Sequence, residues 1–211
     1  MNQRSTSAGK VHPLRARLKQ ATRAAILEAA EAVFAERGFH GARMEEIASR
    51  AGVAVGTLYN YFEDRKHLLG ALLDACGAEL GVKLERTLEN RRAFDARLEE
   101  FMRVAVRHLD EHWRVFAILI EDELAYGRGG SGNSRHRPAM QEVFQASVRL
   151  CELGVREGAL RQEGGELFPA LLVGAIDALF RRQLFVERGA PIQGRVPALA
   201  RFFLKGAGVR G

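Results

Sequence analysis

Apolar residues recur along most of this chain with the period of an α-helix. In the first such stretch, about residues 21–37, they form a stripe that would face a core, and Gly38 follows as a helix stop. The stripe consists of Ile26, Leu27, Ala30, Val33 and Phe34. No convincing strand-like alternation of apolar and polar residues is present, so the pattern predicts an all-α fold.

The same period predicts six further long or medium helices. Their expected ranges are about 64–88, 94–112, 113–124, 138–158, 166–188 and 194–205. Asp64 can cap the first of these, and a break near His112 separates the second from the third. The segment Gly127–Arg137 is rich in glycine and serine, so we expect a flexible loop there, and residues 1–20 are also expected to be loose.

The segment Met44–Lys66 combines two short amphipathic helices with a tight turn. Gly52 can end the first helix in the left-handed backbone conformation that glycine tolerates. Val53 and Leu58 are apolar at the positions that would lock the second helix onto the first. This combination predicts a helix-turn-helix, whose second helix enters the DNA major groove, rather than an ordinary helical hairpin.

A larger set of residues around this segment forms a specific motif. It comprises Gly38-Phe39, Glu46-Ile47-Ala48, Ala51-Gly52-Val53, Gly56-Thr57-Leu58-Tyr59-Asn60-Tyr61-Phe62 and Leu68. With these residues the chain closely resembles, from about Thr22 to Leu73, the DNA-binding domain of the TetR family of bacterial transcriptional regulators. Beyond Leu73 only the length and the all-helical pattern agree with that family.

The resemblance implies three parts: a basic, flexible arm over residues 1–20, a helix-turn-helix domain over 21–66 and a helical effector-binding and dimerisation domain over 67–211. It also implies a dimeric repressor that a small hydrophobic or aromatic ligand releases from double-stranded operator DNA. A metal-responsive regulator, an activator and a ligand-independent regulator of the same fold are alternatives.

The resemblance places one set of residues in the major groove: Val55, Gly56, Thr57, Tyr59, Asn60 and Tyr61. Asn60 is our candidate for base readout, because its amide can pair with adenine in a bidentate manner. Tyr59 and Tyr61 can donate hydroxyl protons to phosphates. Arg43 replaces the usual Ser or Thr cap, so phosphate contacts are expected from Arg43, Arg65 and Lys66.

Two C-terminal helices are apolar over more than one side, which indicates a second partner. We expect these helices to form a twofold four-helix interface between two copies of the chain, as in the family. The candidate interface residues are Leu171, Ala175, Ile176, Ala178, Leu179, Phe180, Val196, Leu199 and Phe203. The alternative is that these side chains are buried within one subunit.

An effector pocket is predicted in the middle of the chain, where apolar and aromatic residues outnumber polar ones. The candidate lining residues are Phe101, Met102, Ala105, His108, Trp113, Phe116, Tyr126, Met140, Phe144 and Cys151. Simple core packing is the alternative for any of them. No cofactor is expected.

The sequence His108-Leu109-Asp110-Glu111-His112 matches the inverted zinc-peptidase motif H-x-x-E-H. Its two histidines stand four residues apart on one helix face, as a metal site requires. A metal-sensing regulator is one interpretation, and a metal-dependent hydrolase that uses His108, Glu111 and His112 is a remote one. Because the hydrolase would leave the DNA-binding half unexplained, we expect the protein not to be an enzyme.

Charge and cysteine content support the interpretation of the chain as a cytoplasmic DNA-binding protein. The formal net charge is +6, and residues 1–23 contain six basic residues and no acidic one, which fits phosphate contact beside the DNA-reading element as well as a solubilising tail. Cys76 and Cys151, the only two cysteines, are expected to be reduced core residues in a cytoplasmic protein. No secretory signal or transmembrane segment is expected.

Overall fold

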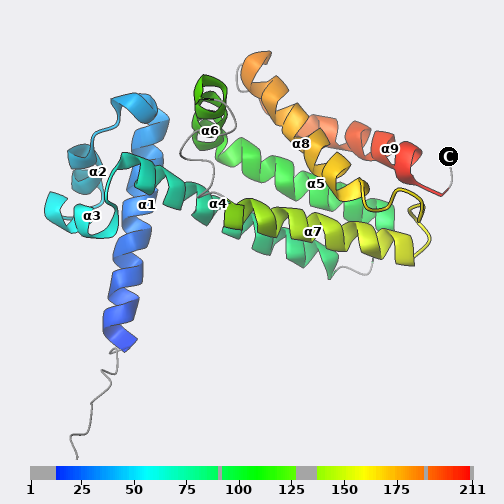
Figure 1. The fold of residues 1–211 in the computed structure, drawn as a ribbon, viewed down its shortest axis with the longest axis horizontal. Helices are drawn as coiled ribbons and strands as arrows, with labels where there is room; N and C mark the ends of the chain where they lie inside the picture. The colour runs from blue at the N-terminus through cyan, green and yellow to red at the C-terminus, as the bar shows by residue number, and fades with distance from the viewer. Residues whose placement is uncertain (1–12, 90–91, 127–136, 188–189, 210–211) are drawn as a thin grey trace, which may run out of the picture. The chain divides into compact units, whose positions relative to one another are not determined.

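The computed structural model describes residues 13–89, 92–126, 137–187 and 190–209 and divides into two compact units, one through Leu69 and one from Gly70. Every regular element in these ranges is a helix, apart from an isolated bridge between Leu160 and Gly208 (Figure 1). The expected all-α fold is therefore confirmed. None of the helices in the described ranges has the length and apolar character needed to cross a membrane.

The first unit contains α1 (Pro13–Gly41), α2 (Met44–Arg50), α3 (Val55–Tyr61) and the start of α4. The two short helices expected within Met44–Lys66 are therefore present as α2 and α3. The expectation of a loose segment through residue 20 was wrong from Pro13 onward, because α1 begins there. Proline suits the first turn of a helix, and Leu, Arg, Lys and Ala after it are all good helix formers. Residues 1–12 lie outside the described part of the chain.

The second unit contains the rest of α4 and five further α-helices. The elements are α4 (Arg65–Leu88), α5 (Phe94–Glu111), α6 (Trp113–Tyr126), α7 (Arg137–Arg156), α8 (Phe168–Phe185), the short 3-10 helix η1 (Gln193–Arg195) and α9 (Val196–Ala207). Asp64 caps α4 as predicted, since the His67 backbone N–H donates to Asp64 Oδ1 at 2.7 Å. The predicted loop at 127–136 lies outside the described residues, and Arg137 already belongs to α7.

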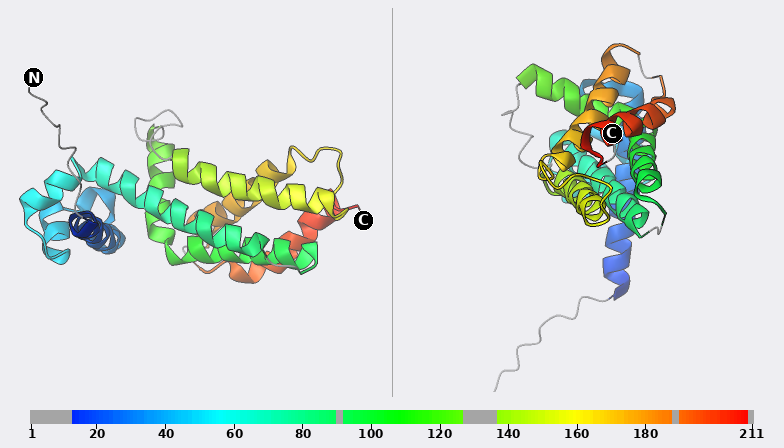
Figure 2. Two further views of the ribbon diagram at one scale, coloured as in Figure 1. Left: turned by 90° about the horizontal axis from the view of Figure 1, so that it is seen from below. Right: turned by 90° about the vertical axis from the view of Figure 1, so that its right-hand side faces the viewer.

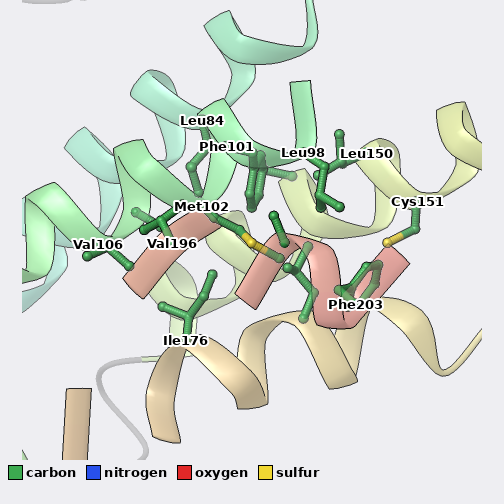
Figure 3. Packing of buried hydrophobic residues seen from close by; sticks show 14 of the residues in the cluster. Leu84, Leu98, Phe101, Met102, Val106, Leu150, Cys151, Ile176, Val196 and Phe203 are labelled. Atoms are coloured by element: carbon green, nitrogen blue, oxygen red, sulfur yellow. The ribbon is translucent and has the colours of Figure 1, made fainter. Parts of the chain in front are cut away.

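Helix α5 lies at the centre of the second unit and packs against α7, α8 and α9. Its buried face combines with α8 and α9 in one apolar cluster, in which Leu98, Phe101 and Met102 are fully enclosed (Figure 3). Burial of such large side chains is the main favourable term for this unit. Cys76 and Cys151 are buried free thiols, as predicted.

On the other side of the unit, α7 runs alongside the second half of α4 (Figure 2). Arg149 Nε donates to Glu85 Oε1 at 2.9 Å, which links the two helices at their surface. A Cβ atom on Gly81 would stand 3.2 Å from the side chain of Glu142, so the helices approach closely there. This packing places one face of α4 against α7 and leaves its Lys83 face beside the end of α5.

Candidate functional site

The turn between α2 and α3 has the geometry that the sequence predicts. Gly52 has a φ of 69°, in the left-handed region, and the Val53 backbone N–H donates to the Ala48 carbonyl at 3.0 Å. Ala48 and Leu58 are fully buried, so the small residue and the apolar residue lock the two helices together. Helix α3 therefore has a fixed inner face and a defined outer face.

The outer face of α3 is formed by Gly56, Tyr59 and Asn60, which are spaced by three and one residues and are all exposed. Tyr59 keeps 47% of its surface in contact with solvent, although it is a large aromatic residue. Val55, Thr57 and Tyr61 are half-buried at the margins of this face. The six residues predicted to read DNA thus divide into three outward residues and three at the edges.

Helix α2 is held to α1 by charged side chains rather than by a hydroxyl cap. Arg50 makes a paired contact with Glu36, with nitrogen–oxygen distances of 2.7 and 3.0 Å. Arg43 stands at the N-cap position without a side-chain cap, and its side chain is exposed. The phosphate contact expected of Arg43 stays a prediction.

Arg65, one of the predicted phosphate contacts, also makes contacts within its own unit. Its Nη1 atom donates to the carbonyl oxygens of His40 and Ala42, both at 2.9 Å, and its guanidinium carbon lies 4.6 Å from the centre of the Phe39 ring. These contacts favour a cation at the start of α4 even when no phosphate is bound. The neighbouring Lys66 is exposed.

The first turns of α1 form an exposed, basic extension. Arg15, Arg17 and Lys19 are all exposed, and Arg23 follows with its guanidinium carbon 5.6 Å from the centre of the Phe62 ring. No acidic residue interrupts this set before Glu28. The predicted basic arm is therefore a helical one over its described part, and it belongs to the same unit as α3.

The structure separates the candidate dimer residues into two groups. Ile176, Phe180, Val196 and Phe203 are buried in the subunit's own core, where they are unavailable to a partner. Leu171 and Ala178 are exposed, whereas Ala175, Leu179 and Leu199 are half-buried. Helical periodicity identified both faces as apolar but could not say which one the subunit itself covers.

Further large exposed apolar side chains on or beside α8 and α9 were not among those candidates. Phe185 is 56% exposed at the end of α8, Val186 follows it, and Phe202 on α9 is 78% exposed. One outward stripe of α8 follows from helical spacing. It contains Leu171, Ala175, Ala178 and Phe185, which are separated by four, three and seven residues. The sequence feature that could have identified Phe185 and Phe202 as interface residues is their position on helices that are apolar over more than one side.

The candidate effector residues do not form one cavity. Phe101, Met102, Ala105 and Cys151 are packed in the core, and Trp113 and Phe116 lie against it half-buried. Met140 and Phe144 are exposed on α7, and the side chain of Tyr126 lies outside the described part of the structure. Of the ten candidates, only His108 lines the pocket described next.

A pocket of about 500 Å³ lies in the second unit between the ends of α4 and α5. Its lining consists of Lys83, Arg86, Thr87, Arg92, Glu100, Val104, Arg107, His108 and Glu111. Four of these residues are cationic and two are carboxylates, so the pocket favours an anionic occupant. Sequence reasoning missed the four cations, although Lys83 and Arg86 stand three apart on one helix.

Beside this pocket, Glu79, His108 and His112 bring three possible ligand atoms within 4.8 Å of one another. The two histidine rings, four residues apart, have centroids 4.5 Å apart. Glu79 from α4, and not Glu111, is the carboxylate of this cluster, whereas Glu111 Oε2 lies 3.7 Å from Lys83 Nζ. The possible ligand set is therefore Glu79, His108 and His112 rather than a set that includes Glu111.

Electrostatics in this cluster follow from burial and from Lys83. Burial, with smaller contributions from the nearby His112 and Lys83, lowers the pKa of His108 to about 4, so the ring is neutral at physiological pH. Lys83 Nζ lies 2.8 Å from Glu79 Oε1, and this hydrogen bond lowers the pKa of Glu79 and raises the pKa of Lys83. Lys83 Nζ also lies 3.4 Å from His108 Nδ1.

Known proteins similar to this chain include DNA-binding regulators with a helix-turn-helix. Residues 26–72 match the family described as bacterial regulatory proteins, tetR family. A helix-turn-helix transcriptional repressor of Mycobacterium tuberculosis is 34% identical over 158 residues, which cover 72% of this chain and 76% of that protein. The fatty acid metabolism regulator protein of Bacillus subtilis is 34% identical over 137 residues, covering 63% and 66% of the two chains.

The fold comparison extends over nearly the whole chain. A crystal structure of the transcriptional regulator FadR from Bacillus subtilis, in complex with stearoyl-CoA, superposes with a TM-score of 0.74. The superposition covers 87% of this chain and 98% of that one, with 19% sequence identity, so it concerns the fold alone. The sequence relatives are transcriptional regulators, in agreement with the expectation that the chain is not an enzyme.

Proposed function

Since this chain belongs to the tetR family of bacterial regulatory proteins, which are DNA-binding transcriptional regulators, we propose that it is a dimeric repressor released from operator DNA by an anionic acyl ligand. On this proposal it acts on DNA in the cytoplasm. The observation that carries the proposal is the outward face of α3, where Gly56, Tyr59 and Asn60 are exposed on a rigidly held helix.

This face has the composition of a DNA-reading surface. Asn60 supplies an amide that can donate to and accept from one adenine, and Tyr59 supplies a hydroxyl for a phosphate. Gly56 presents no side chain, and no atom lies within 4 Å of the position of an added Cβ, so the backbone can approach the groove floor. Arg43, Lys66 and the basic start of α1 supply cations for the flanking phosphates.

The test of this function begins with selection of preferred duplexes from a random-sequence DNA pool by the wild-type protein. On the selected duplex, Asn60→Ala should weaken binding by a factor of about 10 to 100, since one good bidentate base contact contributes roughly 1–3 kcal/mol. Gln145→Ala is the matched control, because Gln145 is an exposed amide on α7. Equal binding by wild type and Asn60→Ala would reject the assignment of Asn60, and absence of any selected sequence would reject the function.

Dimerisation is supported by the outward apolar stripe of α8. Leu171 and Phe185 are exposed on it, with the small residues Ala175 and Ala178 between them, which would allow close approach of a second helix. Phe202 and Leu199 extend the apolar surface onto α9. A twofold dimer would present two copies of α3 to two half-sites, which compensates for the small contact area of a single helix-turn-helix.

The ligand class is supported by the charge of the pocket in the second unit. Its cations, Lys83, Arg86, Arg92 and Arg107, suit phosphate or carboxylate groups, and Val104 adds an apolar wall. The similar Bacillus subtilis regulator was crystallised with stearoyl-CoA, a thioester with a long acyl chain and a phosphorylated head. On this proposal the ligand is an acyl-CoA, in place of the small hydrophobic or aromatic molecule expected from the sequence.

A further inference from the structure

The cluster of Glu79, His108 and His112 is not required by the proposed DNA reading, the dimer or the acyl ligand. Glu79 lies on α4, His108 on the last turn of α5, and His112 at the cap between α5 and α6. Their candidate ligand atoms lie within 4.8 Å of one another. When metal–ligand bonds are about 2.1 Å long, the ligand atoms around a tetrahedral ion lie roughly 3.4 Å apart. Small side-chain rotations would bring the three candidate ligand atoms to this separation.

His108 is an unusual residue for a purely structural position. Only 1% of its surface is exposed, and its Nε2 atom has no hydrogen-bond partner among the described residues, although a backbone hydrogen bond to Cys76 acts on the ring. A buried imidazole nitrogen without a partner is available to bind a ligand.

Lys83 presently supplies the positive charge of this cluster. Its ammonium group contacts Glu79 at 2.8 Å and approaches His108 Nδ1 at 3.4 Å. The lysine side chain is 35% exposed and has a second carboxylate, Glu111, at 3.7 Å. It can therefore rotate toward Glu111 and leave Glu79 and the histidines to another cation.

We propose that Glu79, His108 and His112 bind one divalent transition-metal ion, which displaces Lys83 and fastens α4 to the end of α5. Two imidazoles and one carboxylate favour Zn²⁺ or a similar borderline ion over Mg²⁺ or Ca²⁺, which prefer sites made of oxygen atoms. His108 and Lys83 also line the open pocket of the second unit, which provides a path for the ion from solvent. Three protein ligands leave at least one coordination position for water.

The inference is tested by titrating the chelator-treated, full-length protein with Zn²⁺ and, separately, with Co²⁺, whose visible absorption reports nitrogen and oxygen ligands. We expect one ion per chain in both titrations and a higher melting temperature in the presence of Zn²⁺. Glu79→Gln and His112→Ala, at positions that are not fully buried, should each weaken binding at least about tenfold.

Two further variants separate a built site from general surface binding. Glu85→Gln should retain the wild-type affinity, since Glu85 lies on α4 outside the cluster and pairs with Arg149. Lys83→Met should bind the ion more tightly than wild type, because it removes the cation that competes for Glu79. Absence of saturable binding by wild type, or equal affinities of wild type, Glu79→Gln and His112→Ala, would overturn the proposal without affecting the proposed function in DNA binding.

Discussion

The guanidinium group of Arg65 donates a hydrogen bond to the backbone carbonyl of Ala42 at 2.9 Å. The same nitrogen donates to His40, so the first residue of α4 is tied to the end of α1 and to the connection before α2. These contacts lie within one compact unit. They make Arg65 part of the framework that holds the helix-turn-helix, because they place its charge beside backbone oxygens.

Replacement of Arg65 by methionine should therefore destabilise the first unit. We expect a loss of about 2 kcal/mol in the free energy of unfolding, because hydrogen bonds from a charged donor contribute roughly 1.5–3 kcal/mol. Denaturant titration followed by circular dichroism measures this. Lys66→Met is the matched control, since Lys66 is exposed, and it should change stability by less than about 0.5 kcal/mol. Equal stabilities of the two variants would contradict the framework role.

Gly56→Ala should separate stability from DNA binding. Alanine fits the site, because nothing lies within 4 Å of its Cβ position, and it should raise the stability of α3 by up to about 1 kcal/mol. The added methyl group would meet the groove floor, so affinity for the selected duplex should fall. Thermal unfolding and fluorescence anisotropy measure the two effects. An unchanged DNA affinity would mean that this face of α3 does not approach DNA closely.

Phe202→Glu should shift the protein from dimer to monomer. Phe202 is 78% exposed on α9, so the substitution spares the core but introduces a charge at the proposed interface. Analytical ultracentrifugation at several concentrations gives the dimer dissociation constant. Val82→Glu provides the control, since Val82 is an exposed apolar residue on α4 and should leave the dimer intact. If both variants remained dimeric, the α8–α9 surface would be the wrong interface.

Arg107→Ala should weaken binding of an acyl-CoA. Removing one cation from the pocket eliminates a charge-assisted contact to the phosphates, which is expected to lower affinity about tenfold. Calorimetric titration with palmitoyl-CoA measures the constant, and release of bound DNA by the same ligand tests the coupling. Arg156→Ala, at an exposed position on α7 outside the pocket lining, should behave like wild type. No binding of acyl-CoA by wild type would reject this ligand class.

The Cys151 thiol should resist alkylation in the native protein. Burial raises its pKa to about 12, so the reactive thiolate is scarce at pH 8 and the sulfur is shielded from reagent. Iodoacetamide labelling followed by mass spectrometry should therefore find Cys151 unmodified in the folded state. Denatured protein, in which both cysteines react, is the control. Rapid native labelling of Cys151 would show that the core around it opens readily.

The sequence by itself determined the helices and the helix-turn-helix. Asp64 as a cap, Gly52 in left-handed conformation and the apolar pair Ala48 and Leu58 are local features, since their effects depend on neighbours within a few residues. The start of α1 was misjudged because the side chains of its first turns are exposed and form no apolar stripe facing the core. The helical conformation of these turns follows from the helix propensity of their residues.

Only the tertiary structure decided which apolar face of α8 is covered. Ile176 and Leu171 are equally apolar in sequence, yet α5 and α9 enclose Ile176 and leave Leu171 exposed. In the same way, periodicity placed His108 and His112 on one face, but the carboxylate that joins them comes from Glu79, about thirty residues earlier on α4. Periodicity describes one helix at a time, whereas burial and ligand sets depend on which helices pack together, and that is fixed by contacts between residues far apart in the chain.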